Sequence, residues 1–176
     1  MSVTIREEIL QYFKNNEAQL RVAMTLLMRG LSVKPAPGRK APRIYLGDIP
    51  VPFRSVARAC GVDWRTVRET VRRIVENPRL LEFFEKLENA GPFFRGVTKL
   101  LNYRCIVIET VRDQPGILAY VSSLLAEKNI NILQVIAEHP LIVDNPRLFV
   151  IIQDEVPSDF VPQVLQHPAI KSVTVY

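Results

Sequence analysis

The sequence predicts an α+β protein with two domains, an all-helical domain over residues 1–101 and a domain of strands and helices over residues 102–176. Apolar residues recur at helical spacing through most of the first hundred positions, whereas strand-like apolar runs begin at Tyr103. The charge also changes there, because residues 1–102 carry 18 Lys and Arg against 10 Asp and Glu, and residues 103–176 carry 5 against 8. A basic domain joined to a mildly acidic one suggests separate tasks, with the basic domain facing a polyanion.

Two helices are expected at the start of the chain, over residues 4–14 and 17–29. Asn16 is a plausible N-cap of the second helix, and Gly30 would end it. The basic, proline-rich segment that follows, with Arg39, Lys40 and Arg43, is either a surface linker or an arm that touches phosphate. Residues 44–46 fit a short strand, as in winged variants of the helix-turn-helix, but no second hairpin is expected to complete a wing.

The most informative segment covers residues 55–68 and predicts two short helices joined by a tight turn. The first helix is expected over 53–60 and the second from Asp63, a good N-cap, to residue 76. Ala57 is small enough for the helices to cross closely, and Gly61 can adopt the positive φ of the turn. Val67 then points back into the shared core. This spacing is typical of a helix-turn-helix, whose second helix enters the major groove of DNA.

Arginine is concentrated in the same helices, with six arginines between positions 54 and 73 against two acidic residues. One interpretation is a solvated face, and the other is an interface with double-stranded DNA. For the second, base-edge contacts are expected from one group of residues and phosphate contacts from another. The candidate base readers are Arg65, Thr66 and Arg68, and the candidate phosphate contacts are Arg54, Arg72 and Arg73. Trp64 is expected to pack against the first helix of the pair, with stacking on a sugar or base as the alternative.

Two further helices are expected at 79–88 and 93–101. The residues after them predict a separate domain of strands and helices. From Tyr103 onward the expected order is strand, helix, strand, strand, helix, strand. Right-handed connections make this a four-stranded antiparallel sheet with both helices on one face, the ferredoxin-like arrangement. The expected ranges are 105–108, 117–128, 131–137, 148–152, 160–166 and 172–176.

The loop at 112–116 predicts a small-molecule site. Gly116 leaves the start of the next helix free of a side chain, so that unpaired backbone N–H groups can bind a small anion. Asp113 could accept from an ammonium group, and Asn131, which we expect beside this loop, could donate and accept. Together these groups suit an amino acid, although an ordinary turn and a strand cap would have the same sequence.

Residues 103–176 resemble an ACT domain, an amino-acid-sensing module, in their element order, in residues 113–118 and in the Asn129-Ile-Asn-Ile132 entry to a strand. The whole chain resembles an archaeal family of predicted regulators of amino-acid metabolism, in which a helix-turn-helix precedes an ACT domain. The resemblance implies pairing of two ACT domains and ligand binding near the glycine of the first loop. The residues it implicates are Asp113, Gly116, Ile117, Leu118 and Asn131.

No catalytic or metal-binding pattern is present, so we expect no enzyme activity, no metal and no cofactor other than an amino-acid effector. Cys60 and Cys105 are expected to be buried in a reducing compartment. The chain starts without a secretory pattern and has no apolar run approaching about 18 residues. We therefore expect a soluble, cytoplasmic protein that does not enter membranes.

These observations predict a ligand-responsive transcriptional regulator that binds DNA as a homodimer and senses an amino acid through its second domain. The alternative is an amino-acid-sensing regulatory subunit that docks on a biosynthetic enzyme without binding DNA.

Overall fold

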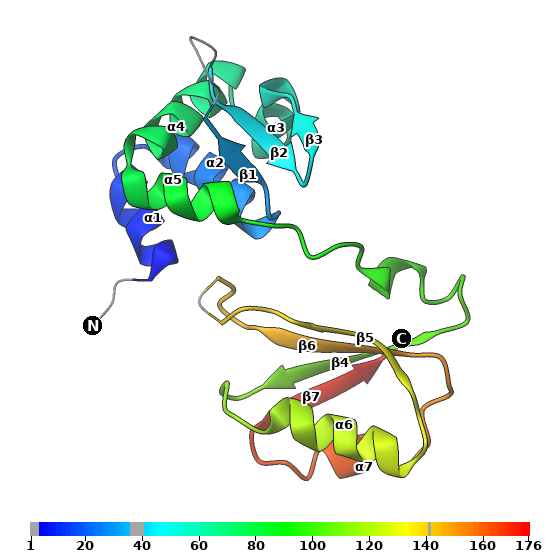
Figure 1. Ribbon diagram of the computed structural model, residues 1–176. Coiled ribbons are helices and arrows are strands. Elements are labelled where there is room, and N and C mark those ends of the chain that lie inside the picture. Colours follow the sequence, from blue (N-terminus) through cyan, green and yellow to red (C-terminus); the bar gives the residue numbers. More distant parts are fainter. Residues whose placement is uncertain (1–3, 36–40, 141) are drawn as a thin grey trace. The chain divides into compact units, whose positions relative to one another are not determined.

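The structure, a computed structural model, describes residues 4–35, 41–140 and 142–176 (Figure 1). The chain divides into two compact units, Met1–Gly91 and Pro92–Tyr176. Each unit combines helices with an antiparallel sheet, which confirms a mixed α+β protein. The division lies ten residues before the predicted boundary at 101/102.

Four of the five helices of the N-terminal unit begin after a residue whose side chain caps them. Thr4 forms a capping box with Glu7 at the start of the first helix. The Asn16 side chain accepts from the Gln19 N–H at 3.0 Å, as predicted. The helices are α1 (Ile5–Phe13), α2 (Glu17–Met28), α3 (Phe53–Cys60), α4 (Trp64–Glu76) and α5 (Pro78–Lys86). Helix α4 packs against α2, α3 and α5 and therefore lies at the centre of the unit.

The N-terminal unit is not all-helical, which corrects the prediction. It contains a three-stranded antiparallel sheet in the order β1 (Ser32–Lys34), β2 (Arg43–Leu46), β3 (Ile49–Val51). Gly47, at φ +58°, and Asp48 form the two-residue turn between β2 and β3. Pro50 lies on edge strand β3, where the missing N–H donor is tolerated. The strands have three or four residues each, too few to show an alternating pattern in the sequence.

The C-terminal unit has the predicted order of strands and helices. Its elements are β4 (Arg104–Thr110), α6 (Ile117–Glu127), β5 (Ile132–Ala137), β6 (Arg147–Ile152), α7 (Phe160–Val164) and β7 (Ile170–Val175). The sheet order is β5-β6-β4-β7, and all neighbours are antiparallel. Helices α6 and α7 cover one face of this sheet (Figure 1), and the main core lies between them and the sheet.

The opposite face of the sheet carries a smaller apolar cluster that includes Phe149 and Cys105. Residues 92–101, which we call the strap, pack against this face and include the 3-10 helix η1 (Phe94–Val97). The Phe93 ring meets the Phe149 ring edge-on, with 5.0 Å between the centroids. The strap therefore belongs to the C-terminal unit, and the helix predicted over 93–101 is a single 3-10 turn followed by further turns.

Candidate functional site

The turn between α3 and α4 is closed by backbone hydrogen bonds. Gly61 has φ +64°, its N–H donates to the Arg58 carbonyl at 3.3 Å, and the Val62 N–H donates to the Ala57 carbonyl at 3.0 Å. This pair of bonds is a Schellman motif, which glycine favours because it lacks a Cβ. The Asp63 carboxylate then accepts from the Arg65 N–H at 2.8 Å and caps α4. Three residues thus separate the two helices.

Two exposed guanidinium groups lie at the start of α4. The Cζ atoms of Arg65 and Arg68 are 5.6 and 5.2 Å from the centroid of the Trp64 ring. Within the described part of the chain, neither arginine forms an ion pair with a carboxylate. Thr66, the third candidate base reader, is half-buried between them. The first two turns of α4 therefore present two exposed guanidinium groups that form no salt bridge with any described residue.

Helix α3 adds a second pair of exposed arginines. Arg54, a predicted phosphate contact, and Arg58 are both exposed and lie one helical turn apart. Arg58 is not in the predicted set, although its spacing of four residues from Arg54 indicates a shared face. Of the three predicted arm residues, Arg39 and Lys40 lie outside the described residues, and Arg43 is the exposed first residue of β2.

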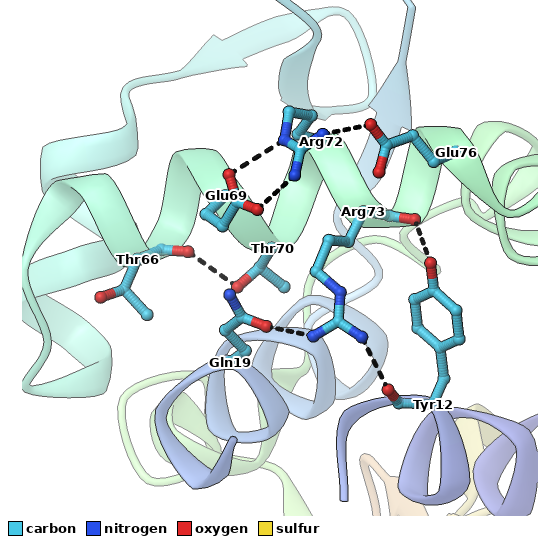
Figure 2. A network of polar contacts seen from close by, with 8 residues as sticks. All are labelled: Tyr12, Gln19, Thr66, Glu69, Thr70, Arg72, Arg73 and Glu76. Carbon is cyan, nitrogen blue, oxygen red and sulfur yellow. Dashed lines mark hydrogen bonds and ion pairs between the residues drawn. The ribbon is translucent and has the colours of Figure 1, made fainter. Parts of the chain in front are cut away.

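Arg72 forms ion pairs with two neighbouring acids of its own helix (Figure 2). Its guanidinium lies 2.5 Å from a Glu69 carboxylate oxygen and also contacts Glu76. The hydrogen bond from Arg72 lowers the pKa of Glu69. Because two carboxylates surround this charge, a phosphate would have to displace them. Arg72 is therefore a weaker candidate for a DNA contact than Arg54 or Arg58.

Arg73 points into the N-terminal unit, which corrects its predicted role (Figure 2). Its Nη1 donates to Gln19 Oε1 at 2.5 Å and its Nη2 donates to the Tyr12 carbonyl at 3.0 Å. The guanidinium also lies 4.8 Å from the centroids of the Tyr12 and Phe13 rings. Position 73 faces α1 and α2 rather than solvent, so Arg73 links three helices instead of holding a phosphate.

In the C-terminal unit, a cavity of about 280 Å³ lies beside the start of α6. Small-molecule sites begin at roughly 300 Å³, so this cavity suits a small ligand. Gly116 has φ +98°, and no side chain caps α6. Four of the five predicted ligand residues line the cavity together with residues from three strands or their ends. The lining residues are Thr110, Asp113, Gln114, Pro115, Gly116, Ile117, Leu118, Ala137, Glu138, Pro146, Arg147 and Leu148.

Two of the lining residues, Glu138 and Arg147, form an ion pair that the sequence analysis does not identify. Arg147 Nη2 and Glu138 Oε1 are 3.1 Å apart, and Glu138 Oε2 accepts from the Arg147 backbone N–H at 3.0 Å. Glu138 raises the pKa of Arg147. The Arg147 guanidinium lies over Phe149, on the sheet face away from α6. The only signal in the sequence is that opposite charges flank the long connection from β5 to β6.

Asn131 does not lie beside the Gly116 loop, which corrects the prediction. It directly precedes β5, where Ile132 pairs with Ile152, and the cavity lies at the other end, where Ala137 pairs with Leu148. Six strand residues span about 20 Å. Helix α6 connects the end of β4 to the start of β5, and these two strands are parallel. It therefore runs along the strands, and its first and last residues lie at opposite ends of them.

Other chemistry is limited in the described residues. No group of three His, Cys, Asp or Glu side chains could hold a metal within these ranges. Cys60 and Cys105 are buried and free, as predicted, and burial raises the pKa of the Cys105 thiol. None of the helices in the described part of the chain combines the length and apolarity that crossing a membrane requires.

Comparison with known proteins found no family model that matches this chain and no matching curated protein. The inference of function therefore rests on the two sites described above.

Proposed function

We propose that this protein is a transcriptional regulator that binds double-stranded DNA through α3 and α4 and an amino acid through the cavity beside α6. The observation that carries the proposal is the pair of exposed guanidinium groups of Arg65 and Arg68. They lie at the start of a capped helix that follows a three-residue turn. A helix with this arrangement can enter the major groove with its first turn toward the bases.

The roles of the individual arginines follow from their partners. Arg65 and Arg68, with Thr66 between them, would reach base edges. Arg54 and Arg58 on α3 would bind phosphates and set the register. Ion-paired Arg72 contributes less, and Arg73 serves the fold.

The amino acid would bind with its carboxylate at the uncapped N-terminus of α6 and its ammonium near Asp113. Two chains would pair so that their α4 helices reach successive major grooves. Ligand binding would change DNA affinity through a coupling of typically 1–3 kcal/mol, which is about 5- to 150-fold. The proposed role is one of binding rather than catalysis.

DNA binding is tested by fluorescence anisotropy with a mixed-sequence duplex at several salt concentrations. We expect the Arg65→Ala, Arg68→Ala double variant to bind at least about tenfold more weakly, because two base contacts are lost. A Lys14→Ala, Lys86→Ala double variant removes the same charge from exposed positions of the same unit and should bind like the wild type. Equal binding by all three proteins would contradict the proposal. Capture of an enzyme in stoichiometric amount, without salt-sensitive DNA binding, would favour the regulatory-subunit alternative.

Amino-acid binding is tested by thermal unfolding of the full-length chain with each of the twenty amino acids. A ligand at 100 times its Kd should stabilise the protein by about 2.7 kcal/mol. Asp113→Ala should abolish this gain. Asn131→Ala should keep it, because Asn131 lies at the start of β5 and the cavity lies at the other end of this strand. Absence of any shift with all twenty, or equal loss in both variants, would contradict the assigned site.

A further inference from the structure

Trp64 occupies an unusual position for a large aromatic side chain. It is the first residue of α4 and is only half-buried, and the guanidinium groups of Arg65 and Arg68 both lie over its ring. It is also the only tryptophan of the chain. One indole ring therefore contacts both of the arginines that the proposed function places against DNA bases.

The contact limits how the two arginines can move. A guanidinium within about 6 Å of an aromatic centroid is attracted to the ring, most strongly for tryptophan. An isolated arginine loses side-chain freedom when it binds, and this loss reduces affinity. A guanidinium that already rests on an indole has lost part of that freedom, so less remains to be lost when it meets a base edge.

We infer that Trp64 is a positioning residue for DNA recognition, whose indole holds Arg65 and Arg68 in the orientation that binds base edges. The inference rests on the proposed function and deepens it. Phosphate binding needs only the positive charge, whereas bidentate binding to a guanine needs a defined orientation. Loss of the indole should therefore reduce sequence discrimination much more than general affinity for DNA.

The experiment uses the full-length chain and two duplexes. The wild-type protein first selects its preferred duplex from a randomised library of about 30 base pairs, long enough for two half-sites. A scrambled duplex of the same composition is the reference, and the ratio of the two affinities is measured by competition. We expect Trp64→Leu to lower this ratio about five- to tenfold with an unchanged salt slope, and Trp64→Phe to restore most of it.

Tyr45 provides a matched control. Lys34 Nζ lies over its ring, 5.1 Å from the centroid. This contact is in the same unit, but it is on the sheet rather than on the helix pair. Tyr45→Leu should leave the affinity ratio unchanged. A ratio in Trp64→Leu equal to that of the wild type, or a ratio that Tyr45→Leu lowers as much, would overturn the inference while leaving the proposed DNA binding intact. If the wild type binds neither duplex, the proposed function itself fails.

A second measurement decides the matter if Trp64→Leu does not fold. Because Trp64 is the only tryptophan, the fluorescence of the wild-type chain reports on this position alone. The selected duplex should shield Trp64 from acrylamide more strongly than the scrambled duplex at equal occupancy. Equal shielding by the two duplexes would overturn the inference.

Discussion

The arginines of α4 differ in the groups that their guanidiniums contact, and these contacts distinguish their roles better than their positions in the sequence do. Arg65, Arg68, Arg72 and Arg73 all lie within nine positions of one helix. The first two lie over an indole, the third between two carboxylates, and the fourth against two aromatic rings and an amide oxygen. Of the four, only the first two are exposed and form no salt bridge within the described ranges. A helical wheel identifies exposed flanks, but it does not show which neighbouring helix faces each flank.

The glycines with positive φ also differ in how much space a Cβ atom would have. Gly61 and Gly30 both have positive φ, but a Cβ at Gly61 would meet nothing closer than 4.0 Å. At Gly30 a Cβ would lie 2.9 Å from the Glu88 carbonyl oxygen and 3.1 Å from the Asn89 Cα.

We therefore predict that Gly61→Ala lowers the free energy of unfolding by about 1 kcal/mol, through backbone strain alone. Gly30→Ala should cost more, because the backbone at 88–89 must also move. Gly96, which has open space and no positive φ, provides the control, and Gly96→Ala should have little effect. Urea unfolding of the four proteins measures these differences. Equal stability of the Gly30 and Gly61 variants would contradict the assigned close contact.

At the scale of elements, the strap at 92–101 packs on the face of the C-terminal sheet that α6 and α7 leave open. Gln134 on β5 donates from Nε2 to the Pro92 carbonyl at 2.9 Å and accepts from the Phe94 N–H at 3.1 Å. The Arg95 guanidinium lies over both Phe149 and Tyr176. One amide side chain and a few ring contacts therefore hold a segment with little regular structure of its own.

Replacing this amide should release the strap. Gln134→Leu keeps a similar volume but removes both hydrogen bonds, each worth about 1 kcal/mol. We expect hydrogen exchange at the Phe94 N–H to become faster, while amides in the centre of β4 keep their protection. Gln153→Leu, at an exposed position outside the strands, is the control. Unchanged exchange at Phe94 in Gln134→Leu would show that the ring contacts alone hold the strap.

At the scale of the whole molecule, the division at Gly91/Pro92 follows from which unit the strap packs against. Sequence periodicity places the boundary at the first strand, because the strap itself looks like a connecting helix. In the structure the strap packs on Phe149 and its neighbours, so these residues need it to remain buried.

This boundary predicts how fragments behave. A fragment of residues 92–176 should fold, whereas a fragment of residues 102–176 should be less stable by about 2 kcal/mol because the aromatic contacts of Phe149 are lost. Cys105 faces the same side of the sheet as Phe149 and is the only cysteine in either fragment. Its reaction with a thiol reagent should be faster in the shorter fragment. Equal stability and equal thiol reactivity would place the boundary at 101/102 instead.

The sequence by itself determined the features that depend on neighbouring residues. The caps at Asn16 and Asp63, the Gly61 turn and the order of elements after Tyr103 all leave local signals in the chain. Helical and strand periodicity fixes which residues face a core, because burial of apolar side chains is the dominant favourable contribution to folding.

Only the tertiary structure decided which distant groups meet. It directed Arg73 toward Gln19 and Tyr12, separated Asn131 from the Gly116 loop, and placed the strap on the open face of the sheet. Each of these outcomes depends on how whole elements pack or cross, and no short window of sequence contains that information.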